Sequence, residues 1–215
     1  MIRWLKPLQW LALGLLATTL SAAAQEQLTE GKQYQRLKQP QLVESGNKIE
    51  VIEFFSYGCP HCRDLEPYLT EWAAKAPADV SFKKIPVVFQ PAWLNLGKIY
   101  YPLEGLGRED LSPKVFQALH GAGIKLWDDK TFFDWAVSNG LDAKKVQEMW
   151  ASFAVNSKMN RAKTLAANYR VDSTPVLFVD GKFMVQSGAL KDSHKGMPAA
   201  LDFLVAKARS ERSKK

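Results

Sequence analysis

The sequence contains only two cysteines in 215 residues, Cys59 and Cys62. A framework of structural disulfides is therefore excluded, because the ring that this pair would close removes little conformational freedom from the unfolded chain. Thiol–disulfide exchange is the better explanation, since a Cys-x-x-Cys pair that follows an apolar run and opens a helix is typical of a redox site.

Long hydrophobic runs are also scarce, and the clearest one lies near the N-terminus. Arg3 and Lys6 precede an apolar stretch from Leu11 to Leu20, and three alanines at 22–24 follow it. This order is typical of a cleaved signal peptide, because a membrane-spanning helix needs roughly 20 apolar residues. We predict that residues 1–24 are a signal peptide and that the exported product is soluble.

Histidine is rare, with three in the chain, and acidic residues are fewer than basic ones, which leaves a net charge of +7. A structural zinc site needs four ligands, whereas His120 and His194 lie in segments unrelated to the cysteines, so we expect no metal and no cofactor. Much of the positive excess lies between Lys207 and Lys215. We expect this tail to be a solvated, frayed end that does not bind nucleic acid.

The order of strand and helix patterns predicts an α/β fold. Apolar runs predict five strands, and helical spacing predicts one helix after the cysteines and one near the C-terminus. The strands are expected at about 34–37, 48–56, 80–89, 175–179 and 182–185, and the helices at about 60–76 and 198–209. Asp180-Gly181 between the last two strands is a strong hairpin signal.

Between residues 91 and 173 no convincing strand pattern is present, while helix start and stop signals recur. Five helices are expected there, at about 92–101, 112–121, 130–139, 142–153 and 157–169. In the fourth, the apolar face is expected to run from Val146 to Phe153. We therefore predict a central mixed β-sheet flanked by helices, formed by residues 25–90 and 174–215, with an all-helical domain inserted at 91–173.

The two cysteines lie where a buried strand passes into a helix. If the helix begins at Pro60, which has no N–H to leave unpaired, Cys59 is its N-cap, where free amides and the positive end of the helix dipole favour a thiolate. We expect Cys59 to be the nucleophile and Cys62, one turn deeper, to be the buried resolving thiol. His61 adds a positive charge or a hydrogen bond beside the thiolate, unless it is a surface residue without a special role.

Two further positions are unusual for their surroundings. Glu53 is a carboxylate inside the buried strand, unless it sits at a strand edge and points to water. Thr174-Pro175 opens a later strand, where a proline is tolerated. The alternative is that the peptide bond between them is cis and faces the Cys59–Cys62 pair.

A set of short motifs recurs in one known family. The motifs are Gly31-Lys32-Gln33-Tyr34, Glu53-Phe54-Phe55-Ser56, Cys59-Pro60-His61-Cys62, Thr174-Pro175, Phe178-Val179 and Gly181-Lys182. With these motifs and its helical insertion, the chain resembles the DsbA family of periplasmic thiol:disulfide oxidases over nearly the whole mature sequence. The resemblance implies a thioredoxin-like fold, a periplasmic location and reoxidation by a DsbB-type inner-membrane partner.

The resemblance also implies roles for residues around the cysteines. Pro60, His61 and Thr174 would tune the redox properties, and Pro175 would be the cis-proline of thioredoxin-like folds. Some family members have valine where this chain has Thr174, so the resemblance implies the direction of the exchange and leaves its strength open. Glu53 would be the buried acid that helps to move the proton of Cys62, with Lys84 as its partner. Lys83 is the alternative partner, because strand parity does not choose between the two lysines.

We therefore expect a monomeric thiol:disulfide oxidoreductase that donates the Cys59–Cys62 disulfide to reduced, newly exported proteins through a mixed disulfide at Cys59. The alternatives are a disulfide isomerase or reductase of the same fold, and a metal- or client-binding chaperone that uses the same thiols. Aromatic residues of the helical segment are expected mainly in the core, with some lining an apolar groove for unfolded clients. They are Trp93, Tyr100, Tyr101, Trp127, Phe132, Phe133 and Trp135.

Overall fold

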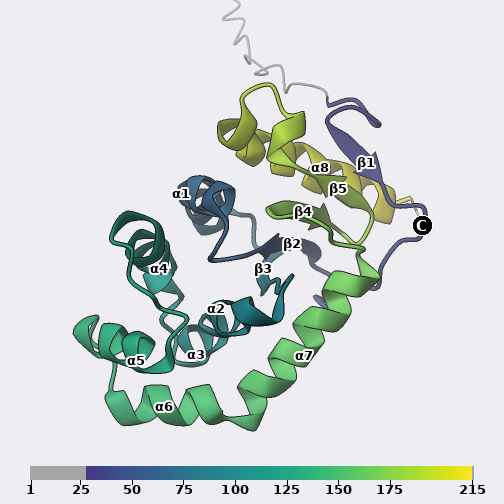
Figure 1. The fold of residues 1–215 in the computed structure, drawn as a ribbon. Coiled ribbons are helices and arrows are strands. Elements are labelled where there is room, and N and C mark those ends of the chain that lie inside the picture. The colour runs from purple at the N-terminus through teal and green to yellow at the C-terminus, as the bar shows by residue number, and fades with distance from the viewer. Residues whose placement is uncertain (1–27, 215) are drawn as a thin grey trace, which may run out of the picture.

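A mixed five-stranded sheet forms the centre of the computed structural model, which describes residues 28–214 (Figure 1). The strands are β1 (Tyr34–Arg36), β2 (Ile49–Phe55), β3 (Val80–Pro86), β4 (Val176–Val179) and β5 (Phe183–Val185). Their order across the sheet is β1-β5-β4-β2-β3, with β2 parallel to β3 and antiparallel to β4. This confirms the predicted α/β class. The signal peptide predicted at residues 1–24 lies outside the described residues.

The ends of two strands follow from local chemistry. β4 and β5 form the predicted antiparallel hairpin, in which Asp180 and Gly181 have φ values of 55° and 61°. A side chain at Gly181 would meet the Gln41 carbonyl, since an added Cβ would lie 2.2 Å from that oxygen. β3 ends at Pro86, earlier than the predicted end at residue 89, and the amide of Val87 still donates to the carbonyl of Phe55 at 2.7 Å.

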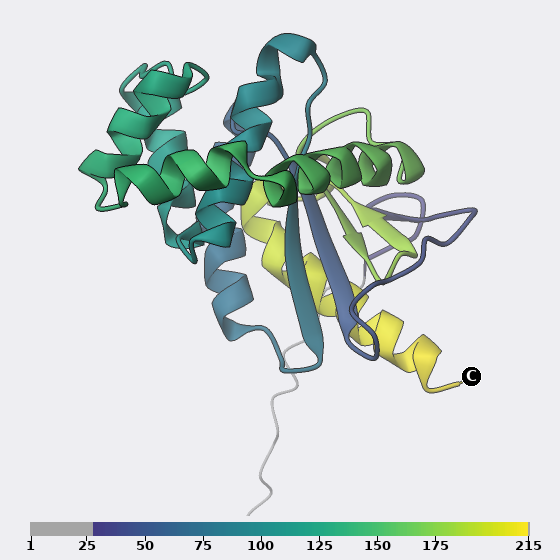
Figure 2. The same ribbon diagram turned by 90° about the horizontal axis from the view of Figure 1, so that it is seen from below.

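Helices cover both faces of the sheet (Figures 1 and 2). On one face α1 (Pro60–Lys75) and α8 (Met197–Arg212) pack against the sheet, and Val51 shares a buried cluster with Leu65 and Leu201. On the other face, Ile52 and neighbouring side chains of the sheet join a second cluster with residues of the helical segment. Val51 and Ile52 join different clusters because successive side chains of a strand point to opposite faces of the sheet. β2 is therefore buried on both sides.

The helical segment lies between β3 and β4 in the chain, as the sequence predicts. Its helices extend to one side of the sheet, and α7 runs back along the sheet toward β4 (Figure 2). None of the helices in the described range has the length and hydrophobicity needed to cross a membrane. The helices are α2 (Leu94–Lys98), α3 (Tyr100–Gly105), α4 (Ser112–Phe116), α5 (Asp129–Ser138), α6 (Ala143–Ala151) and α7 (Phe153–Asn168), with a π-helical turn (Gln117–Gly121) after α4.

The predicted boundary between the last two inserted helices is wrong. The apolar spacing carries the fourth predicted helix to Phe153, but α6 ends at Ala151 and Phe153 begins α7. Ser152 is the reason, because its extended backbone stops α6 and its side chain caps α7 by accepting a hydrogen bond from the amide of Val155 at 3.2 Å. Phe153 is therefore 87% exposed, and Val155 is buried in its place.

The basic C-terminal segment is more ordered than predicted. The frayed end expected from Lys207 onward is wrong as far as Arg212, because α8 continues to that residue. Arg209 bonds the carboxylate of Asp79 at 2.7 Å. Arg212 pairs with the buried Asp180 of the hairpin turn and donates hydrogen bonds to the carbonyls of Asn47 at 2.8 Å and Lys48 at 3.1 Å. The end of α8 is thus tied to the sheet by charge.

Replacement of Arg212 by alanine is expected to lower the free energy of unfolding by about 1–3 kcal/mol, because it leaves the buried Asp180 with one of its two cationic partners and frees two carbonyls. Urea denaturation at neutral pH measures the change. Lys214→Ala removes a basic residue beyond α8 and serves as the control, with an unchanged midpoint. Equal midpoints for both variants would contradict a stabilising role of Arg212.

Candidate active site

The Cys59–Cys62 pair lies at the point where β2 passes into α1 (Figure 1). Cys59 is the N-cap of α1 and Pro60 is its first residue, as the sequence predicts. The amide of Cys59 donates to the carbonyl of Ser56 at 3.0 Å, which closes the turn between strand and helix. Both thiols are free, Cys59 half-buried and Cys62 fully buried, so Cys59 is the sulfur that a partner can reach.

The surroundings of Cys59 stabilise its thiolate. The hydrogen bond from the Cys62 thiol contributes most, and it lowers the pKa of Cys59 to about 5 together with the amides of Cys62 and His61 and the side chain of Thr174. Partial burial opposes this shift but does not cancel it. Burial raises the pKa of Cys62 far above its ordinary value, and the hydrogen bond to Cys59 adds to this effect. Cys59 is therefore ionised at neutral pH while Cys62 keeps its proton.

The turn before β4 faces the reactive sulfur. The peptide bond between Thr174 and Pro175 is cis, which is the sharper of the two sequence-based alternatives. The carbonyl of Thr174 lies 3.3 Å from the Sγ of Cys59 and accepts a hydrogen bond when that sulfur carries its proton. The antiparallel pairing of β2 with β4 accounts for the approach, because it sets the start of β4 beside the end of β2.

All three histidines contact the active-site region, which the sequence did not predict for two of them. His61 is exposed on α1, and the ring of His194 stacks on it with centroids 5.8 Å apart. The Nε2 atom of His120 lies 2.8 Å from the carbonyl oxygen of Tyr57. His120 and His194 are far from the cysteines along the chain, but the fold brings both to the active-site region. Within residues 28–214, no group of three or more histidine, cysteine or acidic side chains is placed to hold a metal ion.

Glu53 lies beneath the cysteines and is fully buried, so the alternative of an exposed strand-edge carboxylate is wrong. Burial raises its pKa to about 7, against the opposing effect of the ammonium of Lys84. The Nζ atom of Lys84 is 3.6 Å from Glu53 Oε2, and neither carboxylate oxygen has a hydrogen-bond partner within residues 28–214. The charge of Glu53 in turn raises the pKa of Cys62, after the larger effects of burial and of the hydrogen bond to Cys59.

The register of the sheet decides which lysine faces Glu53. In the parallel pairing of β2 and β3, Glu53 stands opposite Lys84, and Lys83 stands opposite Ile52. Lys83 consequently points to the other face, where its Nζ atom bonds Glu50 at 2.6 Å. The preferred partner, Lys84, is confirmed.

Glu66 is a site residue that the sequence analysis missed. It is buried on α1 and bonds the same Lys84 ammonium, so two carboxylates share one cation. The pKa of Lys84 is raised, because the attraction of Glu53 and Glu66 outweighs the cost of burial. A signal was present in the sequence, since Glu66 follows Cys62 by one helical turn and lies on the same buried side of α1.

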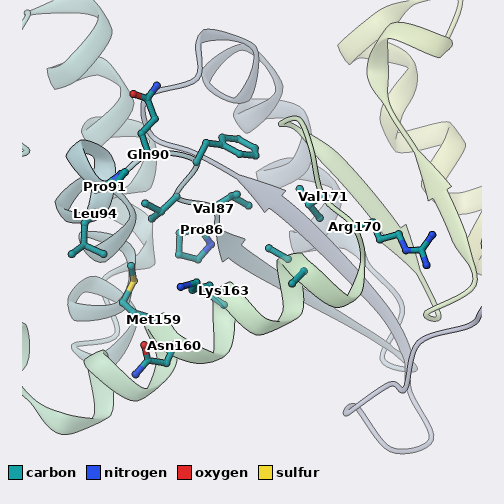
Figure 3. A pocket seen from close by; sticks show the side chains of 15 residues that line it. Pro86, Val87, Gln90, Pro91, Leu94, Met159, Asn160, Lys163, Arg170 and Val171 are labelled. Atoms are coloured by element: carbon teal, nitrogen blue, oxygen red, sulfur yellow. The ribbon is translucent and has the colours of Figure 1, made fainter.

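Of two clefts, only the smaller includes a residue next to Cys59. The larger, of about 590 Å³, lies between the carboxyl end of β3 and α7, with Pro86 and Val87 facing Met159 and Lys163 (Figure 3). A smaller one, of about 420 Å³, is lined by Gly58 next to Cys59 and by residues of the helical segment. Of the aromatic side chains expected to be divided between core and groove, Trp93 and Trp127 line this smaller cleft.

In the reduced protein, the ultraviolet absorbance of the thiolate is expected to appear with a midpoint near pH 5, the pKa that the hydrogen bonds give Cys59. Cys62→Ala should raise this midpoint, because it removes the strongest of those hydrogen bonds. Cys59→Ala serves as the control and should abolish the low-pH transition. A wild-type midpoint near about 8.5, the value of an unperturbed thiol, would contradict the described stabilisation.

Comparison with known proteins agrees with this geometry. Residues 32–96 match the thioredoxin family and residues 98–194 match the family described as a DSBA-like thioredoxin domain. The chain is 38% identical to the thiol:disulfide interchange protein DsbA of Bordetella parapertussis over 92% of this chain and 94% of that protein. For the protein of the same name in Pseudomonas aeruginosa, the identity is 36% over 93% and 95% of the two chains.

Solved structures show the same similarity in three dimensions. The crystal structure of Pseudomonas aeruginosa DsbA superposes with a TM-score of 0.81 at 36% identity, covering 87% of this chain and 97% of that one. Reduced DsbA1 from Neisseria meningitidis gives a TM-score of 0.77 at 27% identity, with 87% and 98% covered. With a redox pair at the start of α1, a cis-proline facing it and an inserted helical region, the chain belongs to the DsbA family of thiol:disulfide interchange proteins.

Proposed function

We propose that this thiol:disulfide oxidoreductase acts as an oxidase that donates the Cys59–Cys62 disulfide to reduced proteins newly exported to the periplasm. The observation that carries the proposal is the contrast between the two thiols, with the pKa of Cys59 lowered to about 5 and that of Cys62 raised. A stabilised thiolate favours the reduced pair, and a pair that prefers to be reduced gives its disulfide away readily.

The transfer needs no reactant beyond the two proteins. A client thiolate attacks the Sγ of Cys59 and forms a mixed disulfide while the Cys59–Cys62 bond breaks, so Cys62 leaves with the electron pair and takes up a proton. A second client thiolate then attacks the client sulfur of the mixed disulfide and releases the Cys59 thiolate. The client loses two electrons and the protein gains them. The half-buried position of Cys59 and the full burial of Cys62 support this order.

The neighbouring residues have distinct proposed roles. Four residues tune the redox pair and its release from clients, namely Pro60, His61, Thr174 and Pro175. The contacts of Thr174 with the sulfur of Cys59 support its part in this role. Glu53, with a pKa raised to about 7 by burial, accepts the proton of Cys62 and donates it back. The ammonium of Lys84 stabilises the ionised carboxylate of Glu53. Proton transfer is favoured when the pKa of the relay lies near the working pH.

The cellular setting is part of the proposal. We place the protein in the periplasm after removal of residues 1–24, acting as a monomer and reoxidised by a DsbB-type quinone-linked membrane partner. Residues 25–90 and 174–215 form the redox domain, and residues 91–173 form the inserted helical domain. The names of the relatives, thiol:disulfide interchange proteins, support the exchange chemistry.

Trapping of mixed disulfides tests the assignment of the nucleophile. Cys62→Ala is first converted by oxidised glutathione to its mixed disulfide at Cys59. A reduced client is then expected to displace the glutathione thiolate and to accumulate as a Cys59–client disulfide, because the resolving thiol that would displace the client is gone. Cys59→Ala should accumulate none, since the remaining Cys62 is buried. Non-reducing electrophoresis after acid quenching measures both. Equal trapping by the two variants would show that the roles are assigned wrongly.

The oxidised protein is expected to be less stable than the reduced one, with a difference that depends on pH. The pKa of Cys59 is about 5 in the fold and about 8.5 in an unfolded chain, so the thiolate stabilises the reduced fold fully above about pH 8.5. The contribution is lost as the pH falls through 5. Denaturant midpoints of both redox forms should therefore differ at pH 8 and converge below pH 5. A gap that is constant with pH would contradict this origin.

Glu53→Gln is expected to slow thiol–disulfide exchange without unfolding the protein, because glutamine keeps the shape of the side chain but cannot carry the proton of Cys62. Stopped-flow exchange rates between pH 5 and pH 8 measure the effect. The wild-type rate should change near the raised pKa of Glu53, about 7, and the variant should lose this step. Identical profiles for the two proteins would remove the proposed proton role.

A further inference from the structure

We propose that His120 is a positioning residue for the Cys59 thiolate, because its imidazole fixes the backbone turn that delivers this cysteine to the start of α1. We call residues 56–59 the active-site turn. The inference concerns the sulfur of Cys59 itself and goes beyond the proposed function, since the same positioning serves an oxidase and a reductase alike.

The active-site turn is held partly from within and partly from outside. The amide of Cys59 donates to the carbonyl of Ser56 at 3.0 Å, and the amide of Gly58 donates to the Ser56 hydroxyl oxygen at 3.2 Å. The carbonyl of Tyr57 is bonded from outside the turn, by the Nε2 atom of His120 at 2.8 Å. Because a carbonyl can only accept, Nε2 of His120 is the donor and carries a hydrogen.

A glycine directly before the nucleophile makes an outside restraint valuable. Glycine loses more conformational freedom on folding than any other residue, so a turn that contains Gly58 is easily loosened. The peptide group between Tyr57 and Gly58 is bonded on both sides, since its N–H donates to Ser56 and its carbonyl accepts from His120. The hydrogen bond of His120 therefore fixes the orientation of this peptide plane.

The inserted segment bonds Tyr57 at two points, and α4 lies beside α1 in Figure 1. Ser112, the first residue of α4, accepts a hydrogen bond from the Tyr57 hydroxyl at 3.1 Å, and both residues are buried. His120 holds the carbonyl of the same residue. The ring of Phe116 packs on both, with centroids 4.9 Å from Tyr57 and 6.2 Å from His120. The helical segment is thus bonded to the chain two residues before the nucleophile.

The π-helical turn after α4 places His120 for this contact. The amide of Ala122 donates at 3.0 Å to the carbonyl of Gln117, five residues earlier, where an α-helix would use the fourth. The additional residue in the turn changes the direction in which its side chains point. Such turns are rare and occur frequently at functional sites. Here the distortion of the helix coincides with a hydrogen bond to the active-site turn.

The position of the turn matters because the sulfur of Cys59 is bonded from several directions. The thiol of Cys62, the amides of Cys62 and His61 and the side chain of Thr174 all stabilise the same thiolate. Hydrogen bonds weaken steeply when donor and acceptor move out of alignment. A loosened turn lets Cys59 move relative to these donors, so the thiolate loses stabilisation although every group that touches the sulfur is still present.

Two substitutions of His120 test the proposal in the whole protein. His120→Leu removes the donor and keeps an apolar side chain of moderate size, whereas His120→Gln keeps an N–H donor at the end of the side chain. We expect His120→Leu to raise the midpoint of thiolate absorbance by about one pH unit and to shift the glutathione equilibrium at pH 7 about tenfold toward the oxidised form. His120→Gln should restore most of both changes.

Ser112→Ala is the matched control, because it removes the other hydrogen bond between the helical segment and Tyr57 and leaves the carbonyl contact in place. It should lower the urea midpoint of unfolding, while the thiolate midpoint and the glutathione equilibrium keep their wild-type values. An equal shift of these two values in Ser112→Ala and His120→Leu would overturn the proposal, since any loosening of the fold would then suffice. Wild-type values in a folded His120→Leu would also overturn it.

The hydrogen on His120 provides a test in the wild-type protein if His120→Leu does not fold. Long-range proton–nitrogen NMR at pH 8 distinguishes a protonated from an unprotonated Nε2. A protonated Nε2 would support the proposal, and an Nε2 without hydrogen would overturn it, because it could not donate to the Tyr57 carbonyl. None of these measurements uses a client protein, so a failure to oxidise clients would overturn the proposed function and leave the role of His120 standing.

Discussion

The stability of a thiolate at the first turn of α1 is the constraint on which the rest of the site depends. The sulfur of Cys59 is stabilised by hydrogen bonds from Cys62, from two amides of the helix start and from Thr174, and together these outweigh the cost of partial burial. The Cys62 thiol and the amides of Cys62 and His61 are local to the turn. Thr174 is not, and it is present because β4 runs antiparallel to the strand that delivers the cysteines. The sheet topology is therefore part of the sulfur chemistry.

Beneath the sulfurs, the protein buries two carboxylates and one ammonium. Lys84 cannot neutralise both Glu53 and Glu66, and Glu53 makes no hydrogen bond within the described part of the chain, so its proton is held more tightly than that of an exposed carboxyl. Buried charges of this kind are expensive and are not needed for a stable core. Their place beneath the Cys59–Cys62 pair is the basis of the proton role proposed for Glu53.

The inserted helical segment contributes to the site as well as to the fold. This segment contributes several lining residues to the cleft beside Gly58, among them Leu119, His120 and Trp127. The segment thereby places apolar surface beside the half-buried sulfur of Cys59. The two main parts of the fold have different tasks at the same site, since the sheet and α1 set the properties of the sulfur while the helices shape the surface around it.

The sequence by itself determined the local features. Four predicted features depend on the chemistry of a few neighbouring residues, and all four are present. They are the helix start at Pro60, the N-cap at Cys59, the hairpin at Asp180-Gly181 and the helices between β3 and β4. The boundary between α6 and α7 was missed because the capping by Ser152 outweighed the apolar spacing that pointed to Phe153.

Only the tertiary structure decided which distant residues meet. The register of β2 with β3 selected Lys84 over Lys83, the packing of α1 brought Glu66 to the same lysine, and the chain path placed His120 and His194 beside the cysteines. The physical reason is that burial and long-range contact depend on how elements pack, while propensity and capping act within a few residues. The sequence identified the reacting sulfurs, and the packing set their proton affinities and the surface around them.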